Sequence, residues 1–327
     1  MLIQHQHPKN SSISVSVLGA PNVGKSSLVN YLIGRDLSVV TDKAQTTRNR
    51  FCCVFTVDRT EVILIDTPGL HRSNQEFNKR MNHQAREGIN GAELNLLLVD
   101  LSRPINKQID EFANNLEEQL TSPLWLILTK SDLKKEFSPA DSKEVFEYSK
   151  KLLPTMDRHF TINSNSGDNI HQLIGAICDV APNGPHHFSD GSISNKSERF
   201  FVTEYIREQA FNLLRDELPH ELAVVIDQFE DCTGRPNETK KSKLNAQISA
   251  TILVNRPSQR AIVIGSKGAI IKKIGMQSRE RIEELVGGQI HLNLHVKVSP
   301  RWFKNNFVLE ELGLPRAPDS NRVWHKK

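Results

Sequence analysis

The sequence has little cysteine and no long apolar run, and each shortage excludes a class of protein. Cysteine accounts for 4 of the 327 residues, Cys52 and Cys53 are neighbours, and no CxxC or Cys/His ligand spacing occurs. We therefore expect no disulfide scaffold and no zinc site, and we expect a reducing compartment. No run of about 18 uncharged apolar residues occurs, so no membrane-spanning helix is expected. The first residues lack the apolar segment of a signal peptide, so residues 1–10 are predicted to form a loose tail.

Aromatic residues are also few, at 6%, whereas hydrophobic residues reach 38% and charged residues 24%. This apolar content is sufficient for packed cores, and at about 150 residues per domain the length predicts two domains. The charge is divided unevenly. Residues 196–327 contain 22 Lys and Arg against 16 Asp and Glu, a net charge of +6, and the first 195 residues carry −2. The C-terminal part is therefore the part expected to meet a polyanion.

Short apolar strands alternate with amphipathic helices in the first half of the chain. Strands are predicted at 13–18, 51–57, 61–66, 94–100, 124–129 and 159–162, and helices near 25–33, 75–90, 106–120, 139–151 and 168–179. The alternation predicts an α/β domain with a mainly parallel sheet and helices on both faces. The link between 51–57 and 61–66 is too short for a parallel crossover and predicts a hairpin.

Pro, Gly, Ser and Asn interrupt the periodicity at residues 181–197 and predict an interdomain linker. The second half is predicted to be α+β, with a helix at 197–217, strands at 222–230, 246–254 and 260–264, helices within 265–287 and a strand at 289–298. The last strand alternates cleanly. We therefore expect domains at 11–180 and 198–314, followed by a basic tail at 315–327.

Residues 19–26 read GAPNVGKS, which matches the phosphate-binding pattern G-x-x-x-x-G-K-[S/T]. The match lies after a predicted strand and before a predicted helix, where the mechanism requires it. Gly19 and Gly24 permit a turn that points backbone N–H groups at phosphates. Lys25 would reach the β- and γ-phosphates, and the Ser26 hydroxyl would bind Mg²⁺.

Two further segments fit the same nucleotide. DTPG at 66–69 follows an apolar strand, which places Asp66 to hold Mg²⁺ through water and the Gly69 N–H to sense the γ-phosphate. QTTR at 45–48 lies in an aperiodic polar stretch, where a threonine would complete the Mg²⁺ shell in a mobile loop. Thr46 and Thr47 both remain open, and Thr47 is preferred.

The base is predicted from TKSD at 129–132. Asp132 can accept hydrogen bonds from both the ring N1–H and the 2-amino group of guanine, a pair of donors that adenine lacks. The stem of Lys130 would pack along the plane of the base. The polar turn INSNSG at 162–167 follows the last strand of this half and would supply a backbone N–H to the guanine O6, with Ser164 as the candidate.

GSKG at 265–268 is a GxxG loop of the kind that clamps the backbone of about four nucleotides. The window 260–275 contains Arg260, Lys267, Lys272 and Lys273 and no acidic residue. The sequence places this loop after the predicted strand AIVI and before a helix. The alternative, an exposed turn, remains open. The aromatic residues Trp302, Phe303 and Phe307 are predicted to pack the closing helix and not to stack on bases.

These motifs, in this order, resemble the translation-factor-related small GTPases. PNVGKSSLVN, KAQTTR and DTPGLH are most similar to the Era family, and AIVIGSKGAIIKKIG at 261–275 is similar to its KH domain. The resemblance spans nearly the whole chain. It implies a P-loop GTPase domain followed by a type II KH domain. It also implies a switch that binds and hydrolyses GTP, contacts small-subunit ribosomal RNA near its 3′ end, and acts in assembly of the 30S subunit.

The resemblance also implies a set of site residues. The candidate catalytic residues are Lys25, Thr47 and Gly69, and the Mg²⁺ candidates are Ser26, Thr47 and Asp66. The candidate GTP or GDP contacts are Gly19, Ala20, Pro21, Asn22, Val23, Gly24, Lys25, Ser26, Ser27, Asp66, Thr67, Pro68, Gly69, Thr129, Lys130, Asp132, Asn163, Ser164 and Asn165. The RNA candidates are Arg260, Gly265, Ser266, Lys267, Gly268, Lys272 and Lys273.

Three positions bear on turnover. Thr129 replaces the Asn of the family motif NKxD, so looser nucleotide binding is expected. Leu70 stands where Ras-like proteins have a water-orienting Gln, so slow hydrolysis is expected. Some relatives bind K⁺ through the residue at Asn22, and here K⁺ binding and mere stabilisation of the loop both remain open. An RNA-binding scaffold with a degenerate GTPase domain is the alternative function.

The resemblance implies single-stranded RNA, 16S-type ribosomal RNA and the 30S subunit as partners, whereas the residues alone support only single-stranded RNA. We expect a monomer located in the cytoplasm. The basic C-terminal end leaves open a weak peripheral contact with anionic lipid of the inner membrane.

Overall fold

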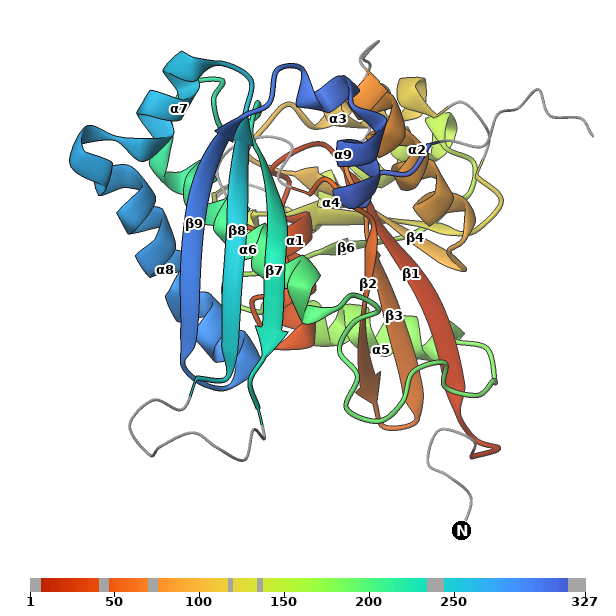
Figure 1. The fold of residues 1–327 in the computed structure, drawn as a ribbon. Helices are drawn as coiled ribbons and strands as arrows, with labels where there is room; N and C mark the ends of the chain where they lie inside the picture. Colours follow the sequence, from red (N-terminus) through yellow and green to blue (C-terminus); the bar gives the residue numbers. More distant parts are fainter. Residues whose placement is uncertain are drawn as a thin grey trace, which may run out of the picture.

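The structure is a computed structural model that describes residues 7–40, 47–69, 76–116, 120–133, 138–233 and 244–316. Within these residues the first half forms a six-stranded sheet with helices on both faces (Figure 1). Its elements are β1 (Ser11–Gly19), α1 (Lys25–Ile33), β2 (Phe51–Val57), β3 (Thr60–Asp66), α2 (Glu76–Asn90), β4 (Leu94–Asp100), α3 (Ile105–Asn115), β5 (Leu124–Thr129), α4 (Pro139–Leu152), β6 (Met156–Thr161) and α5 (Ile170–Val180).

The strand order is β2-β3-β1-β4-β5-β6, and every neighbouring pair is parallel except β2 and β3, which form the predicted hairpin. Strand β4 is buried along its whole length. Leu96 and Leu98 enter the core under α1 and α5, whereas Leu97 and Val99 enter the core under α3 and α4. The predicted mainly parallel sheet with two covered faces is therefore confirmed.

The second half forms a three-stranded sheet, in which β7 is antiparallel and β9 parallel to the central β8. Helices α6 and α8 pack together beside it (Figure 1). The elements are α6 (Glu198–Leu213), β7 (Ala223–Asp231), β8 (Ala246–Val254), α7 (Pro257–Ile264), α8 (Ala269–Val286), β9 (Ile290–Val298) and α9 (Asn306–Glu311).

The prediction of a strand at 260–264 was wrong, because these residues form the C-terminal part of α7. Pro257 occupies the first turn, and the Gln259 side chain accepts the backbone N–H of Arg256, which fixes the helix start. Within the apolar run only Val263 is buried, while Ile262 is 52% exposed. The periodicity of a short apolar run does not distinguish a helix from a strand. Here Pro257 and Gln259, which are typical of a helix start, indicate the helix.

The two halves meet at α2. Its residues Phe77 and Met81 share a core cluster with Leu253 of β8 and with Trp302 and Leu309. The indole N–H of Trp302 donates to the Glu221 carbonyl oxygen at 2.8 Å, so the predicted packing role of this residue is confirmed. Phe303 also packs against this cluster. Phe307 is 76% exposed, so the prediction that it packs the closing helix was wrong.

Candidate functional site

The phosphate-loop motif lies between β1 and α1, as the sequence predicts. Gly19 ends β1 at φ 136°, and a Cβ atom there would come within 2.5 Å of the Leu98 carbonyl oxygen. Gly24 precedes α1 at φ 99°. Both positions require glycine, because L side chains are strained at these angles and a side chain at Gly19 would also collide with β4.

Lys25 begins α1 and is buried under this loop. Its Nζ donates to the carbonyl oxygens of Gly19 and Ala20, both at 2.9 Å. Burial lowers the pKa of the ammonium group to about 8, and the nearby Asp66 carboxylate opposes that shift. Ser26 and Ser27 follow in the first turn of α1, where the helix N-terminus favours an anion.

Asp66 ends β3 and is fully buried near the phosphate loop. Its Oδ2 accepts the Ser38 hydroxyl at 2.7 Å and the Thr47 hydroxyl at 3.5 Å. Its Oδ1 is buried and has no hydrogen-bond partner among the described residues. Burial raises the pKa of this carboxyl to about 6, against the Ser38 hydrogen bond and the charge of Lys25. A buried carboxylate oxygen without a donor fits a hard cation such as Mg²⁺.

The structure thus brings Thr47 to Asp66, while Thr46 lies outside the described residues. Ser38 was missed, because no motif contains it and only the folded loop places its hydroxyl on the carboxylate.

Gly69 packs directly against the phosphate loop. A Cβ atom on it would lie 3.6 Å from both the Gly19 carbonyl oxygen and the Pro21 Cδ atom. The preceding segment, with Pro68, is held by Thr67, whose hydroxyl donates to the Val17 carbonyl oxygen of β1 at 2.9 Å. Leu70 lies outside the described residues.

Thr129 ends β5, and its hydroxyl turns toward the phosphate loop. Oγ1 donates to the Val23 carbonyl oxygen at 2.7 Å and lies 3.2 Å from the Val99 carbonyl oxygen. The threonine therefore ties β5 to the loop, a tether that the sequence alone did not reveal. Asp132 follows in the short 3₁₀ helix Ser131–Leu133 and is exposed, so its carboxylate is accessible to a base.

The turn after β6 folds tightly against α1. The Asn163 side-chain carbonyl accepts the backbone N–H of Asn165 at 2.9 Å. The Ser164 hydroxyl is buried and without a partner among the described residues. Gly167 has φ 83°, and a Cβ atom on it would lie 2.0 Å from the Tyr31 hydroxyl. Three separate loops, after β1, β5 and β6, thus meet at the carboxyl edge of one sheet, where open α/β sheets bind ligands.

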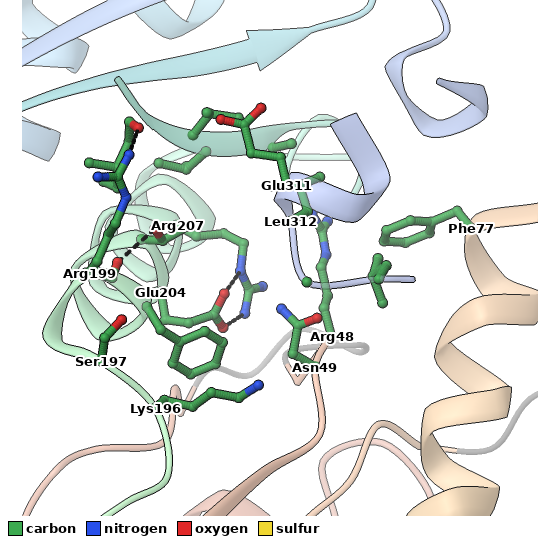
Figure 2. A pocket seen from close by; sticks show the side chains of 18 residues that line it. Arg48, Asn49, Phe77, Lys196, Ser197, Arg199, Glu204, Arg207, Glu311 and Leu312 are labelled. Carbon is green, nitrogen blue, oxygen red and sulfur yellow. Dashed lines mark hydrogen bonds and ion pairs between the residues drawn. The ribbon is translucent and has the colours of Figure 1, made fainter. Parts of the chain in front are cut away.

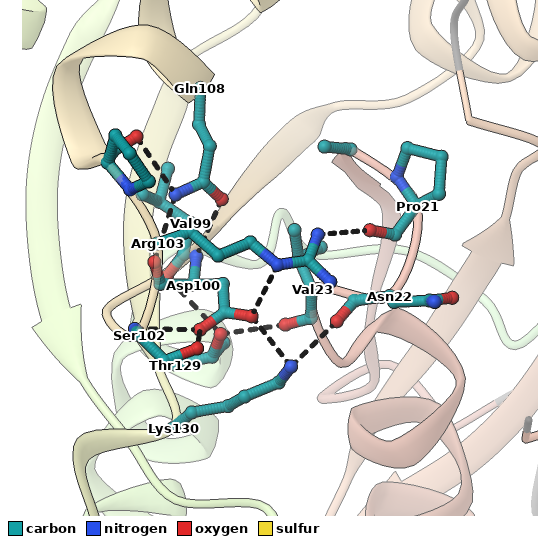
Figure 3. Close-up of polar contacts among 12 residues, drawn as sticks. Pro21, Asn22, Val23, Val99, Asp100, Ser102, Arg103, Gln108, Thr129 and Lys130 are labelled. Atoms are coloured by element: carbon teal, nitrogen blue, oxygen red, sulfur yellow. Dashed lines mark hydrogen bonds and ion pairs between the residues drawn. The ribbon is translucent and has the colours of Figure 1, made fainter. Parts of the chain in front are cut away.

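Two charged residues beside the phosphate loop were missed. Asp100 ends β4 with no exposed side-chain surface and pairs with Lys130 at 2.6 Å, and Arg103 lies 3.3 Å from the same carboxylate oxygen (Figure 3). Burial alone would raise the pKa of Asp100, but hydrogen bonds from Lys130 and Ser102 outweigh it and lower that pKa. The signal was available, because Asp100 is a polar residue at the carboxyl end of a buried strand.

The GxxG residues join α7 to α8 and do not follow a strand. Gly265, Lys267 and Gly268 all have positive φ, at 72°, 51° and 79°. A Cβ on Gly265 would lie 2.7 Å from Ile270, whereas nothing lies within 4 Å of one on Gly268. The polar candidates around this turn are all at least partly exposed: Arg260, Ser266, Lys267, Lys272 and Lys273. The turn therefore presents a basic, uncovered surface at one end of α8.

The described part of the chain contains no helix with the length and apolarity needed to cross a bilayer. No group of three or more potential metal-ligating His, Cys, Asp or Glu side chains occurs within the ranges given above.

Comparison with known proteins matches both halves of the chain. The family model for a 50S ribosome-binding GTPase matches residues 14–130, and the model for a KH domain matches residues 217–303. GTPase Era of Leuconostoc citreum is 35% identical over 91% of this chain and 95% of its own length. GTPase Era of Geobacter sp. strain M21 is 36% identical over 91% and 96%.

Two solved structures are similar over 94% of this chain and all of their own. Both have a TM-score of 0.82 and 28% sequence identity. One is Era in complex with MgGDPNP and nucleotides 1506–1542 of 16S ribosomal RNA, and the other is a single-residue variant of Aquifex aeolicus Era bound to GDP and AlF₄⁻.

Proposed function

Because this chain belongs to the Era family of GTPases, we propose that it couples GTP hydrolysis to binding of 16S-type ribosomal RNA and acts in maturation of the 30S subunit. One observation carries the coupling: the loop that contains Thr47 is attached at both ends to the KH half of the molecule. The phosphate loop, Asp66 and Asp132 supply the nucleotide end, and the basic GxxG turn supplies the RNA end.

The attachment at the start of the loop is through Asp36. Its carbonyl oxygen accepts the Tyr205 hydroxyl at 3.1 Å and the Arg281 guanidinium at 2.5 Å. Arg281 also pairs with Glu208 of α6 and lies over the Tyr205 ring. Arg281 is part of α8, and the N-terminus of that helix is the GxxG turn. A single rigid helix therefore connects the RNA candidate residues to the nucleotide loop.

The attachment at the end of the loop is through Arg48, which is 6% exposed. Its guanidinium donates to the carbonyl oxygens of Leu222 (2.7 Å) and His220 (3.0 Å) in the KH half. A cavity of about 220 Å³ between the two halves opens beside it (Figure 2). The ion pair of Arg207 with Glu204 lines this cavity. Ordering of Thr47 by nucleotide would thus act directly on the KH half through its neighbour.

The linker is bound along the edge of the first sheet. The buried Glu61 carboxylate accepts the backbone N–H groups of His187 (2.7 Å) and Phe188 (3.0 Å), and the Val54 N–H donates to the Ile193 carbonyl oxygen. Because these bonds hold the linker on the first domain, we propose that the nucleotide state is communicated to the KH half through the direct contacts of Asp36 and Arg48, and not through the linker. The domain limits 11–180, 181–197 and 198–314 remain part of the proposal.

For the nucleotide we propose the predicted contacts, with Asp132 selecting guanine. Ser26, Thr47 and Asp66 would hold Mg²⁺, which when bound offsets the phosphate charge. The hydrogen bond from Thr129 to Val23 would hold the phosphate loop in place of the Asn of the family motif. Any loss of nucleotide affinity would therefore come from weaker contacts to the base and not from a looser loop.

We also propose that K⁺ binds beside the phosphates through the Asn22 side chain. The Asn22 carbonyl oxygen is engaged by Lys130 at 2.8 Å, and the side chain extends away from that contact (Figure 3). K⁺ would supply fixed positive charge in the way an arginine finger does. We expect GTP turnover about 10-fold faster in K⁺ than in Na⁺ at equal ionic strength. The preference should vanish in Asn22→Ala, and equal rates in both salts would overturn the assignment.

The test of the main proposal is GTP turnover with and without a single-stranded RNA of the small-subunit 3′ end, in K⁺ buffer. We expect slow hydrolysis that RNA accelerates by about 5-fold or more, the scale of ordinary coupling. Lys267→Glu should weaken RNA binding and reduce the acceleration without changing the basal rate. RNA binding without any hydrolysis would instead support a scaffold with a degenerate GTPase domain.

We propose further that the protein is a cytoplasmic monomer, with weak contact to anionic lipid of the inner membrane through its basic C-terminal end, part of which lies outside the described residues. Sedimentation velocity, and co-sedimentation with anionic vesicles compared with neutral ones, test these two points.

A further inference from the structure

Three consecutive carbonyl groups of the phosphate loop are held from outside by side chains. Arg103 Nη1 donates to the Pro21 carbonyl oxygen at 3.0 Å. Lys130 Nζ donates to the Asn22 carbonyl oxygen at 2.8 Å, and Thr129 Oγ1 to that of Val23 at 2.7 Å (Figure 3). Thr129 and Lys130 belong to the guanine motif, whereas Arg103 belongs to no motif.

These contacts set the direction of the opposite groups. In a trans peptide unit the C=O and the following N–H point in opposite directions. Holding the carbonyls of Pro21, Asn22 and Val23 outward therefore directs the next three N–H groups inward. Inward N–H groups are the ones that cradle phosphate oxygens in a loop of this type.

Asp100 organises two of the three donors. Its Oδ2 receives Lys130 Nζ at 2.6 Å and Arg103 Nε at 3.3 Å, and its Oδ1 receives the backbone N–H and the hydroxyl of Ser102. Gln108 of α3 brackets the Asp100 backbone on both sides, accepting its N–H and donating to its carbonyl oxygen. The carboxylate is thus a fixed, buried counterion that aims two cations at neighbouring carbonyls.

We propose that Arg103, oriented by Asp100, is a positioning residue for GTP hydrolysis that presets the Pro21–Asn22 peptide. The inference rests on the proposed nucleotide site and adds a residue to it. Gly69, the candidate γ-phosphate sensor, packs on Pro21, so this peptide lies at the terminal-phosphate end of the loop. Arg103 would therefore act, through this peptide, on binding of the phosphate that GTP has and GDP lacks.

The test compares Arg103→Gln with Lys107→Gln. Lys107 also carries one positive charge and lies four residues further on, in α3, but it is 72% exposed and contacts only Glu111 among the ion pairs of the described chain. We expect kcat/KM for GTP to fall about 10-fold in Arg103→Gln, mainly in kcat, with GDP affinity changed by less than about 3-fold. Arg103→Lys should recover part of the loss, because it keeps a cationic donor. Lys107→Gln should behave as the wild type.

Three results would overturn the inference: unchanged turnover in Arg103→Gln, an equal loss in Lys107→Gln, or an equal loss of GDP affinity, which would indicate a merely loosened loop. Thermal unfolding of each variant identifies misfolded protein, and Asp100→Asn then provides a second route to the same contact, with the same split between GTP and GDP expected. Absence of hydrolysis in the wild type would instead contradict the proposed function, and the wild-type assay alone distinguishes that result from a failure of the role of Arg103.

Discussion

Replacing Lys25 with Met is expected to reduce GTP turnover by at least about 100-fold and to leave the fold intact. The ammonium group is the cation buried under the phosphate loop, and in the described structure it rests on two carbonyl oxygens of that loop. A phosphate group would offer it a stronger, charge-assisted partner. Methionine preserves the apolar stem of the lysine and removes the ammonium group, with its charge and its two hydrogen bonds to the loop.

The stability of this variant distinguishes a catalytic loss from a structural one. Burial lowers the pKa of Lys25 to about 8, which shows that the charged form is held at a cost in the free protein. Relief of this cost should offset the loss of the hydrogen bonds to the Gly19 and Ala20 carbonyl oxygens, so the melting temperature should stay within a few degrees of the wild type. Turnover is measured by phosphate release, and stability by thermal unfolding without nucleotide. If Lys25→Met hydrolysed GTP at the wild-type rate, the phosphate loop would have no part in the reaction.

The geometry of the phosphate loop was predictable because its motif fixes the backbone locally. Gly19 and Gly24 both require angles that favour glycine, and a glycine at such a position marks the turn in the sequence itself. Asp66 lies at a strand end, so the parallel sheet brings it to the loop without further information. The hairpin of β2 and β3 followed from the length of its link alone.

The remainder depended on contacts that no local pattern encodes. Arg103 reaches Pro21 across 82 positions of sequence, and Ser38 reaches Asp66 across a loop that has no periodicity. Phe307 was predicted to pack from its residue type, but α9 turns it to solvent. The segment at 260–264 was predicted to be a strand because a short apolar run of this kind is compatible with both a strand and a helix. Contacts between side chains that are distant in sequence depend on how the whole chain packs, so no local pattern predicts them.

Arg48 gives the second large prediction, since its buried guanidinium connects the end of the nucleotide loop to the KH half. Besides its carbonyl partners it lies 5.3 Å from the Phe77 ring centre in α2 and 5.6 Å from that of Phe211 in α6. Burial and the neighbouring Arg207 lower its pKa to about 9, so it remains charged at neutral pH. Arg48→Met would leave buried carbonyls without a donor, and we expect a loss of about 3 kcal/mol in the free energy of unfolding.

The functional consequence of Arg48→Met should differ from that of Lys25→Met. Basal turnover should persist within a few-fold, because Arg48 contacts neither Lys25 nor Asp66 in the hydrogen bonds and ion pairs of the described residues. RNA should still bind through the GxxG turn. The acceleration of turnover by RNA should be lost, and by reciprocity the tightening of RNA binding by a GTP analogue should be lost with it.

The matched control is Arg59→Met, which removes one positive charge from an exposed position in the turn between β2 and β3. It should change neither stability nor coupling. A destabilised Arg48→Met protein is assayed well below its melting temperature, and Tyr205→Phe, which removes one hydroxyl donor at Asp36, tests the other end of the loop with a smaller change. If RNA accelerates both variants as it does the wild type, the loop ends do not carry the signal. The signal would then run through other contacts between the halves, such as the α2 packing at Phe77 and Met81, which neither substitution removes.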